Sequence, residues 1–341
     1  MDILYLNGKP KERITSMKKK SMLIIVLILT FAVSIFTFNK NHELVDKESL
    51  AVFIDDVKTD SFPSKGTVTF LKADCDNNAT IEWDKDSWGL FASNLTKKTK
   101  CNLYFKNLES INDKLNDLVK SDTTNIASDD PDGNIRYIGA NPSNYVYFNC
   151  SDYDNQTSDT CEIWRIIGLF KNINKEDGTK EDLVKIIKDD SIGSVAWDTN
   201  NSNIWANASL KSSFNSGIYY NKTLKNDTTR NMIESVVWKL GSTTSFIGDS
   251  DGNPSSLYSA ERNSSNSNNW TGKIALMYPS DYGYAVGGSD RETCLSKSLY
   301  NWSSMPKCYN NNYLYKANIY QWTLMTNNLT GSYVYAVKSN G

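Results

Sequence analysis

The most apolar stretch of the chain is Ser21–Phe38, which contains no charged residue and follows directly on three lysines at 18–20. A helix of this length would span about 27 Å, close to the thickness of a bilayer's hydrocarbon core. The basic flank predicts a cytoplasmic leader at 1–20 and an exported remainder. We therefore expect a single-pass transmembrane anchor. A cleaved signal segment, with Met17 as the start in place of Met1, is the alternative and would give a secreted protein.

After this stretch the chain is polar at 39–50, which we interpret as a stalk. Short runs of β-branched and aromatic residues then alternate with turn residues, a pattern typical of strands. The region 51–107 is therefore predicted to be a small all-β module. Its expected strands are Thr67–Leu71, Ala79–Trp83, Trp88–Phe91 and Asn102–Phe105.

The pattern changes to helical spacing at Glu109–Lys120. Ile111, Leu115 and Leu118 recur at intervals of four and three residues, which places them on one face of a helix. A polar linker follows, so the region 108–132 is predicted to be a helix and linker joining two modules.

The remaining region, 133–341, has strand-like apolar runs, the clearest at 161–172 and 183–188. Two short helices are expected, one starting near Ser209 or Asn207 and an amphipathic one at Thr228–Lys239. Residues 242–269 are rich in Ser and Asn and are predicted to form a long loop. The fold class expected from this order is α+β: an N-terminal transmembrane helix, the small all-β module, and a twisted antiparallel sheet with two helices and long loops.

Composition excludes several classes of function. The 341 residues carry a net charge of −2, which gives no general attraction to nucleic acid, so no nucleic-acid partner is expected. His42 is the only histidine. The region beyond it therefore lacks an imidazole for a Ser-His-Asp or Cys-His site, or for a histidine-ligated zinc.

Six cysteines fall into three pairs that are close in sequence. In an exported chain an even number of cysteines indicates disulfides, although six allow 15 pairings. The simplest scheme keeps each pair within one predicted module. The sequence contains no Cys-x-x-Cys motif, so it does not indicate a cysteine-ligated metal cluster. The expected bonds are Cys75–Cys101, Cys150–Cys161 and Cys294–Cys308.

An acidic segment, Asp249-Ser-Asp251-Gly-Asn253, resembles the start of a calcium-binding loop. The segment Asp129–Asn134 has a similar pattern. Carboxylates two residues apart beside a glycine turn suit Ca²⁺, so Asp249, Asp251 and Asn253 are the candidate metal ligands and Ca²⁺ the candidate cofactor. The alternative is that Asp, Asn and Gly occur here because they favour turns.

Aromatic residues could form a ligand platform, because Trp and Tyr combine a broad apolar face with a polar atom. Most of the nine tryptophans stand in apolar segments and are expected in the core. Trp270 and Trp302 lie among polar residues and are the candidate ligand-binding residues. Packing of loops is the alternative role for both.

Four segments carry a resemblance to a known group of proteins. They resemble exported gut-bacterial surface proteins with a C-type-lectin-like domain of unknown function, which is distantly similar to the formylglycine-generating enzyme fold. The resemblance implies that 133–341 is such a domain. It implies no enzyme activity, because no oxidase motif surrounds the late cysteine pair. The chain ends where a hairpin turn would be, so a missing closing strand is expected. The segments are CEIWRIIGLF (161–170), IWANASLKSSFNSGIYY (204–220), GKIALMYPSDYGYA (272–285) and YQWTLMTNNLTGSYVYAVKSNG (320–341).

The sequence therefore predicts a membrane-anchored extracellular binding or adhesion protein. A glycan or protein ligand is expected to meet the loops 242–269 and 286–313. A structural or assembly component of the cell surface is the first alternative. An extracellular enzyme is the second, and Asp281 and Asp290 are the carboxylates it would use first. No residue is assigned a catalytic role.

Overall fold

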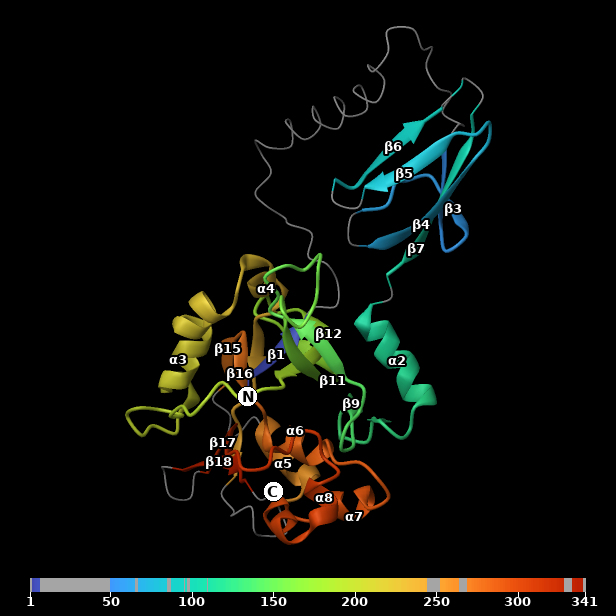
Figure 1. Cartoon of the computed structure of the whole chain (residues 1–341). Coiled ribbons are helices and arrows are strands. Elements are labelled where there is room, and N and C mark those ends of the chain that lie inside the picture. The colour runs from blue at the N-terminus through green and yellow to red at the C-terminus, as the bar shows by residue number, and fades with distance from the viewer. Residues whose placement is uncertain are drawn as a thin grey trace. The chain divides into compact units, whose positions relative to one another are not determined.

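The computed structural model forms two compact units, which are described separately (Figure 1). Unit 1 comprises Met1–Lys9 and Ser110–Gly341, and unit 2 comprises Pro10–Glu109. The residues described are 2–6, 50–64, 67–84, 87–94, 96, 99–108, 110–243, 252–263, 269–327 and 333–339.

The predicted transmembrane segment at 21–38 lies outside the described residues. Within the described ranges, no helix is long and apolar enough to cross a membrane. The longest of these helices, α2 (Ile111–Ser121), has 11 residues, about half of what a bilayer requires. This finding corrects the predicted fold class, which began with a transmembrane helix.

Unit 2 is an all-β module, and its four predicted strands are present. One sheet has the order β3-β2-β7-β4, in which β2 and β7 are parallel, and β5 and β6 form a separate hairpin. The strands are β2 (Leu50–Ile54), β3 (Val57–Thr59), β4 (Val68–Cys75), β5 (Thr80–Asp84), β6 (Gly89–Ser93) and β7 (Cys101–Asn107).

The core of unit 2 is small and aromatic. Its fully buried members include Leu103 and Phe105, which alternate along one face of β7 as a half-buried strand requires. Trp83 packs edge-on against Phe105 and Trp88. The Cys75–Cys101 disulfide joins β4 to β7 where the two cysteines face each other across the ladder.

Unit 1 is built on an antiparallel sheet of order β16-β1-β12-β11-β9-β8, with β10 paired to β11 beside β9. The strands β11 and β12 lie at its centre and pair with each other over most of their length. The strands are β1 (Asp2–Leu6), β8 (Ile126–Ala127), β9 (Ile135–Tyr137), β10 (Tyr145–Phe148), β11 (Glu162–Asn174), β12 (Lys180–Lys188) and β16 (Ile274–Leu276).

The central strands are buried on both faces, and each buried run is apolar except for one basic residue, Arg165 in β11 and Lys185 in β12. Every residue of β11 from Trp164 to Phe170 and of β12 from Leu183 to Ile187 is buried. Gly168 is required where β9 passes close to β11, because a Cβ atom there would collide with the carbonyl oxygen of Ile135. Figure 1 shows α2 beside β9 and β11, and Leu115 of this helix is part of the core of unit 1. The helix that was predicted to join the two modules therefore packs as an element of unit 1.

The C-terminal half of unit 1 contains more helices than predicted. The expected helix near Ser209 is α3, whereas the predicted helix Thr228–Lys239 divides into α4 and β13, because its second half is the β-branched run at 236–237. The predicted loop 242–269 contains α5. The elements are α3 (Ser209–Asn215), α4 (Asp227–Met232), β13 (Val236–Trp238), β14 (Ser242–Thr243), α5 (Pro254–Arg262), β15 (Trp270–Gly272), α6 (Pro279–Tyr284), α7 (Arg291–Leu295), α8 (Pro306–Tyr309), β17 (Gln321–Asn327) and β18 (Tyr333–Val337).

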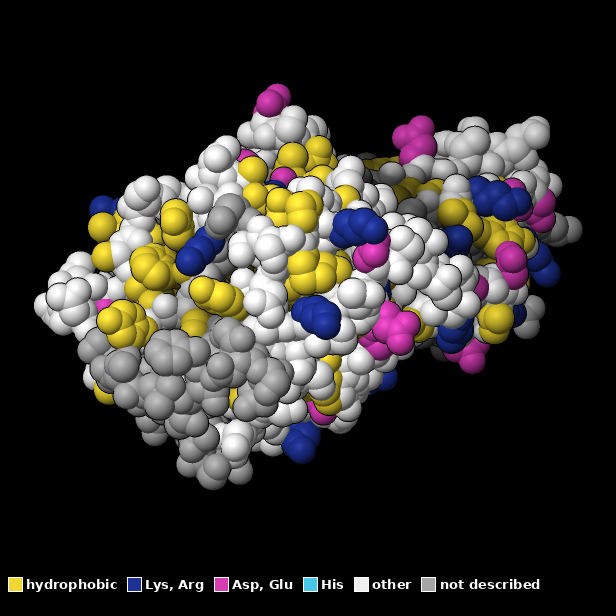
Figure 2. Space-filling view, turned by 90° about the horizontal axis from the view of Figure 1, so that it is seen from below, with side chains coloured by type: hydrophobic (Ala, Val, Ile, Leu, Met, Phe, Trp, Pro, Cys, Tyr) yellow, Lys and Arg dark blue, Asp and Glu magenta, His cyan; other side chains and the backbone are white. Residues whose placement is uncertain are grey.

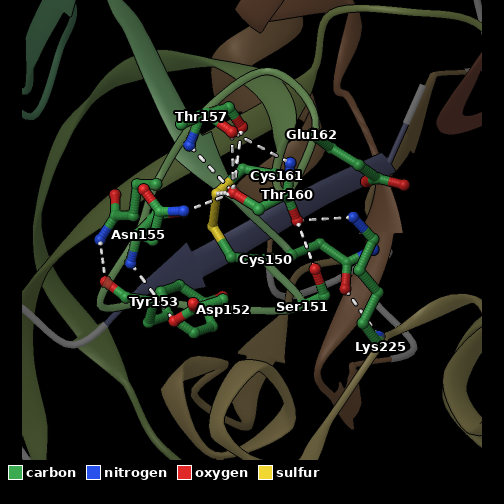
Figure 3. The surroundings of a disulfide bond; sticks show 12 residues. Cys150, Ser151, Asp152, Tyr153, Asn155, Thr157, Thr160, Cys161, Glu162 and Lys225 are labelled. Carbon is green, nitrogen blue, oxygen red and sulfur yellow. Dashed lines mark hydrogen bonds between the residues drawn. A yellow bond between two sulfur atoms is a disulfide. The ribbon is translucent and has the colours of Figure 1, made fainter.

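All three predicted disulfides are present. Cys150 follows β10 and Cys161 precedes β11, so this bond closes the connection between two paired strands (Figure 3). Inside that connection, the Thr160 hydroxyl donates to the Asn155 carbonyl, and Lys225 donates from outside to the Thr160 carbonyl. The third bond, Cys294–Cys308, joins α7 to α8.

The two units predict separate responses to the loss of one disulfide. Replacing Cys75 and Cys101 by Ala should destabilise unit 2 by about 2–5 kcal/mol, because a core this small depends on the disulfide for stability. Calorimetry of the full chain should then show a lowered transition for unit 2 and an unchanged one for unit 1. An equal loss in both transitions would contradict the division of the chain.

Candidate functional site

The two candidate tryptophans are placed differently by the fold. Trp302 is 0 % exposed, and its indole N–H donates to the Cys294 carbonyl, so its ring offers no face to a ligand. Trp270 lies on β15, partly buried, with its ring edge-on to Trp205. Its contacts fit the packing role, and its role in ligand binding stays a prediction.

The predicted calcium ligands are only partly within the described residues. Asp249 and Asp251 lie outside them. Asn253 is the N-cap of α5, where its side-chain oxygen accepts from the Ser256 amide. No group of three or more His, Cys, Asp or Glu side chains in the described part of the chain is arranged to hold a metal ion.

The second acidic segment uses its carboxylates to bind protein groups. Asp130 accepts from the amides of Asp132 and Asn134 and from the Arg136 Nε at 2.7 Å. Asp129 forms an ion pair with Arg291 at 2.7 Å. These contacts match the alternative interpretation, in which the acidic residues shape a turn.

A buried network of charges surrounds Asp281, the first of the two candidate catalytic carboxylates. Its two oxygens accept from Lys185 Nζ on β12 at 2.5 Å and from an Arg136 nitrogen on β9 at 3.0 Å. Arg136 also binds Asp130, so two cations balance two carboxylates. Lys185 and Asp281 are 0 % exposed, and Arg136 is 2 % exposed. The network therefore has no access to a substrate and acts as a structural ion cluster.

Aromatic rings enclose the cations of this cluster. The ring centroid of Phe170 is 4.5 Å from the Arg136 guanidinium carbon and 4.7 Å from Lys185 Nζ, and the ring centroid of Tyr278 is 4.8 Å from the same Nζ. Burial lowers the pKa of Lys185 to about 8, against the pull of Asp281. Burial acts to raise the pKa of Asp281, but the charges of Lys185 and Arg136 outweigh it and hold that pKa below its usual range.

Glu261 on α5 is a second buried acid, next to this cluster. Its oxygens accept from the Ser280 amide at 2.9 Å and from the Ser280 hydroxyl at 2.5 Å. Burial raises the pKa of Glu261 to about 7, although the charge of Arg262 acts in the opposite direction. The contacts of Arg136 and Lys185 with Asp281 were not expected from the sequence, because they join residues 145 and 96 positions apart.

The second candidate carboxylate, Asp290, lies apart from the cluster. It is 32 % exposed and pairs with Lys307 at 3.3 Å. No contact joins Asp290 to Asp281 among the interactions of the described residues. The two carboxylates predicted for an enzyme are therefore not brought together as an acid–base pair.

A groove of about 410 Å³ is accessible among the described residues of unit 1. Its floor is apolar, formed by Leu210 and Phe214 of α3 and by Leu276 of β16. One wall is the segment that follows β12, and the other is the segment that enters β17. We call this feature the β12–β17 groove. Its lining residues are Ser191, Ile192, Gly193, Ser194, Val195, Leu210, Phe214, Leu276, Lys316, Asn318, Ile319, Tyr320, Gln321 and Trp322.

The walls of the β12–β17 groove combine exposed aromatic surface with fixed polar groups. Tyr320 is 67 % exposed. The Trp322 indole N–H donates to the Val195 carbonyl, which ties the two walls together. Gln321 donates to the Leu314 carbonyl, which fixes this side chain at the start of β17. Lys316 is held by Asp189 at 2.7 Å.

Two other surfaces are less suited to hold a ligand. A larger hollow in unit 2, about 540 Å³, is lined by only five residues and is therefore shallow. These residues are Thr69, Leu71, Lys106, Asn107 and Leu108.

Figure 2 shows one face of the molecule, on which hydrophobic side chains lie in several separate patches and basic side chains stand among acidic and polar ones. The described part of that face carries no broad basic field for a polyanion.

Mutations in the Asp281 cluster and in the Asp290–Lys307 pair should differ in how much they lower the free energy of unfolding. Asp281→Asn leaves two buried cations with one carboxylate and should lower the free energy of unfolding by about 3–5 kcal/mol. Asp290→Asn removes only an exposed pair and should cost about 0–1 kcal/mol. Urea denaturation of both variants checks this, and equal small losses would contradict the role given to Asp281.

The raised pKa of Glu261 should make the stability of the protein depend on pH. Between about pH 4.5 and the raised pKa, the unfolded chain has lost this proton while the folded protein keeps it, so the free energy of unfolding falls as pH rises. In Glu261→Gln this contribution is absent. We expect a smaller loss of stability between about pH 5 and pH 7 in the variant than in the parent. Parallel pH profiles would show that Glu261 has an ordinary pKa.

Comparison with known proteins finds no match to this chain among protein-family models, curated proteins or solved structures. Function is therefore inferred from the geometry of the β12–β17 groove and of the Asp281 cluster.

Proposed function

We propose that this chain is an exported binding protein that takes an extracellular glycan or protein segment in the β12–β17 groove. The observation that carries the proposal is the groove itself. It has an apolar floor, an exposed aromatic rim at Tyr320 and walls tied together by the Trp322–Val195 hydrogen bond. Small-molecule and peptide sites are concave and mostly apolar, with a few fixed polar groups.

Export is supported by the cysteines. All six form disulfides, and none is free. Such bonds persist in oxidising compartments and are rare in the cytosol. Each bond closes a connection within one unit, which suits a protein that must keep its shape outside the cell.

Binding is favoured over catalysis because the groove lacks a convergent acid–base pair. Among the described residues that line the groove, Lys316 alone is charged, and it is paired with Asp189. The buried acids Asp281 and Glu261 do not line the groove. The sequence resemblance to C-type-lectin-like domains makes glycans the first ligand class to test.

Tyr320 should carry a large share of the binding energy. An exposed aromatic at the rim of an apolar groove stacks on a sugar face or packs on a peptide side chain. Tyr320→Ala should weaken binding by about 1–2 kcal/mol, which is roughly a 5- to 30-fold increase in Kd. The measurement is a glycan array and a panel of immobilised extracellular proteins, followed by titration of any hit.

A matched control is Tyr300→Ala. This tyrosine is 65 % exposed, against 67 % for Tyr320, but it lies outside the groove. Its removal should leave binding unchanged. If both variants bind equally, or if the parent chain binds nothing on either panel, the groove is not a ligand site.

A further inference from the structure

The Lys316 side of the β12–β17 groove carries more positive than negative charge. Lys316 lines the groove, and its side chain is 26 % exposed. Its Nζ lies 2.7 Å from an Asp189 oxygen, and the same oxygen lies 3.8 Å from an Arg165 nitrogen. Within the part of the chain that the structure describes, Asp189 is the one carboxylate that pairs with either cation. Two positive charges therefore share one negative charge here.

The other contacts of Arg165 leave its charge unbalanced. Its Nε donates to the Asn144 side-chain oxygen at 2.6 Å, and its Nη2 donates to the Pro142 carbonyl at 3.3 Å. Both acceptors are neutral. Arg165 is buried, so solvent and salt screen its charge less than that of a surface residue. The next carboxylate along the chain, Asp190, is exposed and does not line the groove. A carboxylate of a bound molecule could balance the excess charge by accepting from Lys316, and such charge-assisted hydrogen bonds are the strong ones.

The remaining wall groups suit a sugar better than a peptide side chain. Ser191, Ser194 and Asn318 line the groove and are exposed, and their hydroxyl and amide groups can both donate and accept. Tyr320 adds an exposed aromatic face on which a sugar ring can stack. A sugar carries hydroxyls all round its ring, whereas an acidic peptide side chain has a polar group only at its tip and would leave most of these wall groups to water.

We propose that the ligand of the β12–β17 groove is an acidic glycan, whose sugar carboxylate binds Lys316 and whose ring stacks on Tyr320. The inference rests on the proposed function, because it names the ligand class of the same groove. The excess positive charge selects the carboxylate, and the hydroxyl, amide and aromatic groups of the walls select the sugar that carries it.

The test compares glycans that differ in one carboxyl group. The full-length chain is titrated with sialyllactose and with an oligosaccharide of galacturonic acid, each as the free acid and as its methyl ester. We expect the chain to bind at least one of the free acids, and its ester about tenfold more weakly, because the ester cannot form a charge-assisted bond with Lys316. Binding of the acid should also weaken as salt is raised, since salt screens the pairing of exposed charges. Equal affinities for acid and ester would overturn the proposal.

Variants of the lysine locate the effect in the groove. Lys316→Gln should weaken binding of the acid about tenfold and leave the ester unchanged, whereas Lys316→Arg keeps the charge and should retain binding. The matched control is Lys307→Gln, because Lys307 is 75 % exposed, is also paired with an aspartate and lies outside the groove. Full binding of the acid by Lys316→Gln would overturn the proposal. The comparison of acid and ester on the parent chain needs no variant, so it decides the matter even if Lys316→Gln disturbs the fold.

Failure of this inference differs from failure of the proposed function. Tyr320-dependent binding of neutral glycans or of protein segments alone would leave the groove as a ligand site and overturn the acidic glycan. Lys316-dependent binding of poly-glutamate, with no binding of either sugar acid, would overturn it in favour of an acidic peptide. If the chain binds none of these molecules, the proposed function fails and this inference fails with it.

Discussion

The ionic contacts of Asp281 are the constraint on which unit 1 depends. One carboxylate joins three elements that are remote in sequence, since it binds Arg136 of β9 and Lys185 of β12 from its position on α6. The same side chain accepts the Tyr278 amide and so caps the helix that carries it. Buried charges are stable only when paired and hydrogen-bonded, so the sheet and α6 can pack together in few other ways.

The shape of the β12–β17 groove depends on these contacts of Asp281. The Asp281 contact fixes β12, and the first wall of the groove begins where that strand ends. Asp189 lies at this point and binds Lys316, which precedes the opposite wall, while Trp322 bonds across to Val195. The two walls are thus held at both ends by side-chain contacts, and a ligand would meet a preformed surface, which reduces the entropy lost on binding.

The sequence predicted the features that depend on local pattern. The disulfides and the long central strand Glu162–Asn174 follow from spacing and apolar runs. The helix α5 was missed because it lies in a Ser- and Asn-rich region, although an Asn cap followed by Pro254 is a helix-start signal. The Asp281 cluster could not be predicted, because Lys185 and Arg136 lie 96 and 145 positions away from it and only the fold brings them together.

The place of β1 in the sheet also constrains the topology of the whole chain. Residues 2–6 form backbone ladders with strands of a unit that contains two disulfides. The strand β1 and the two strands that it pairs with must therefore lie on the same side of any membrane.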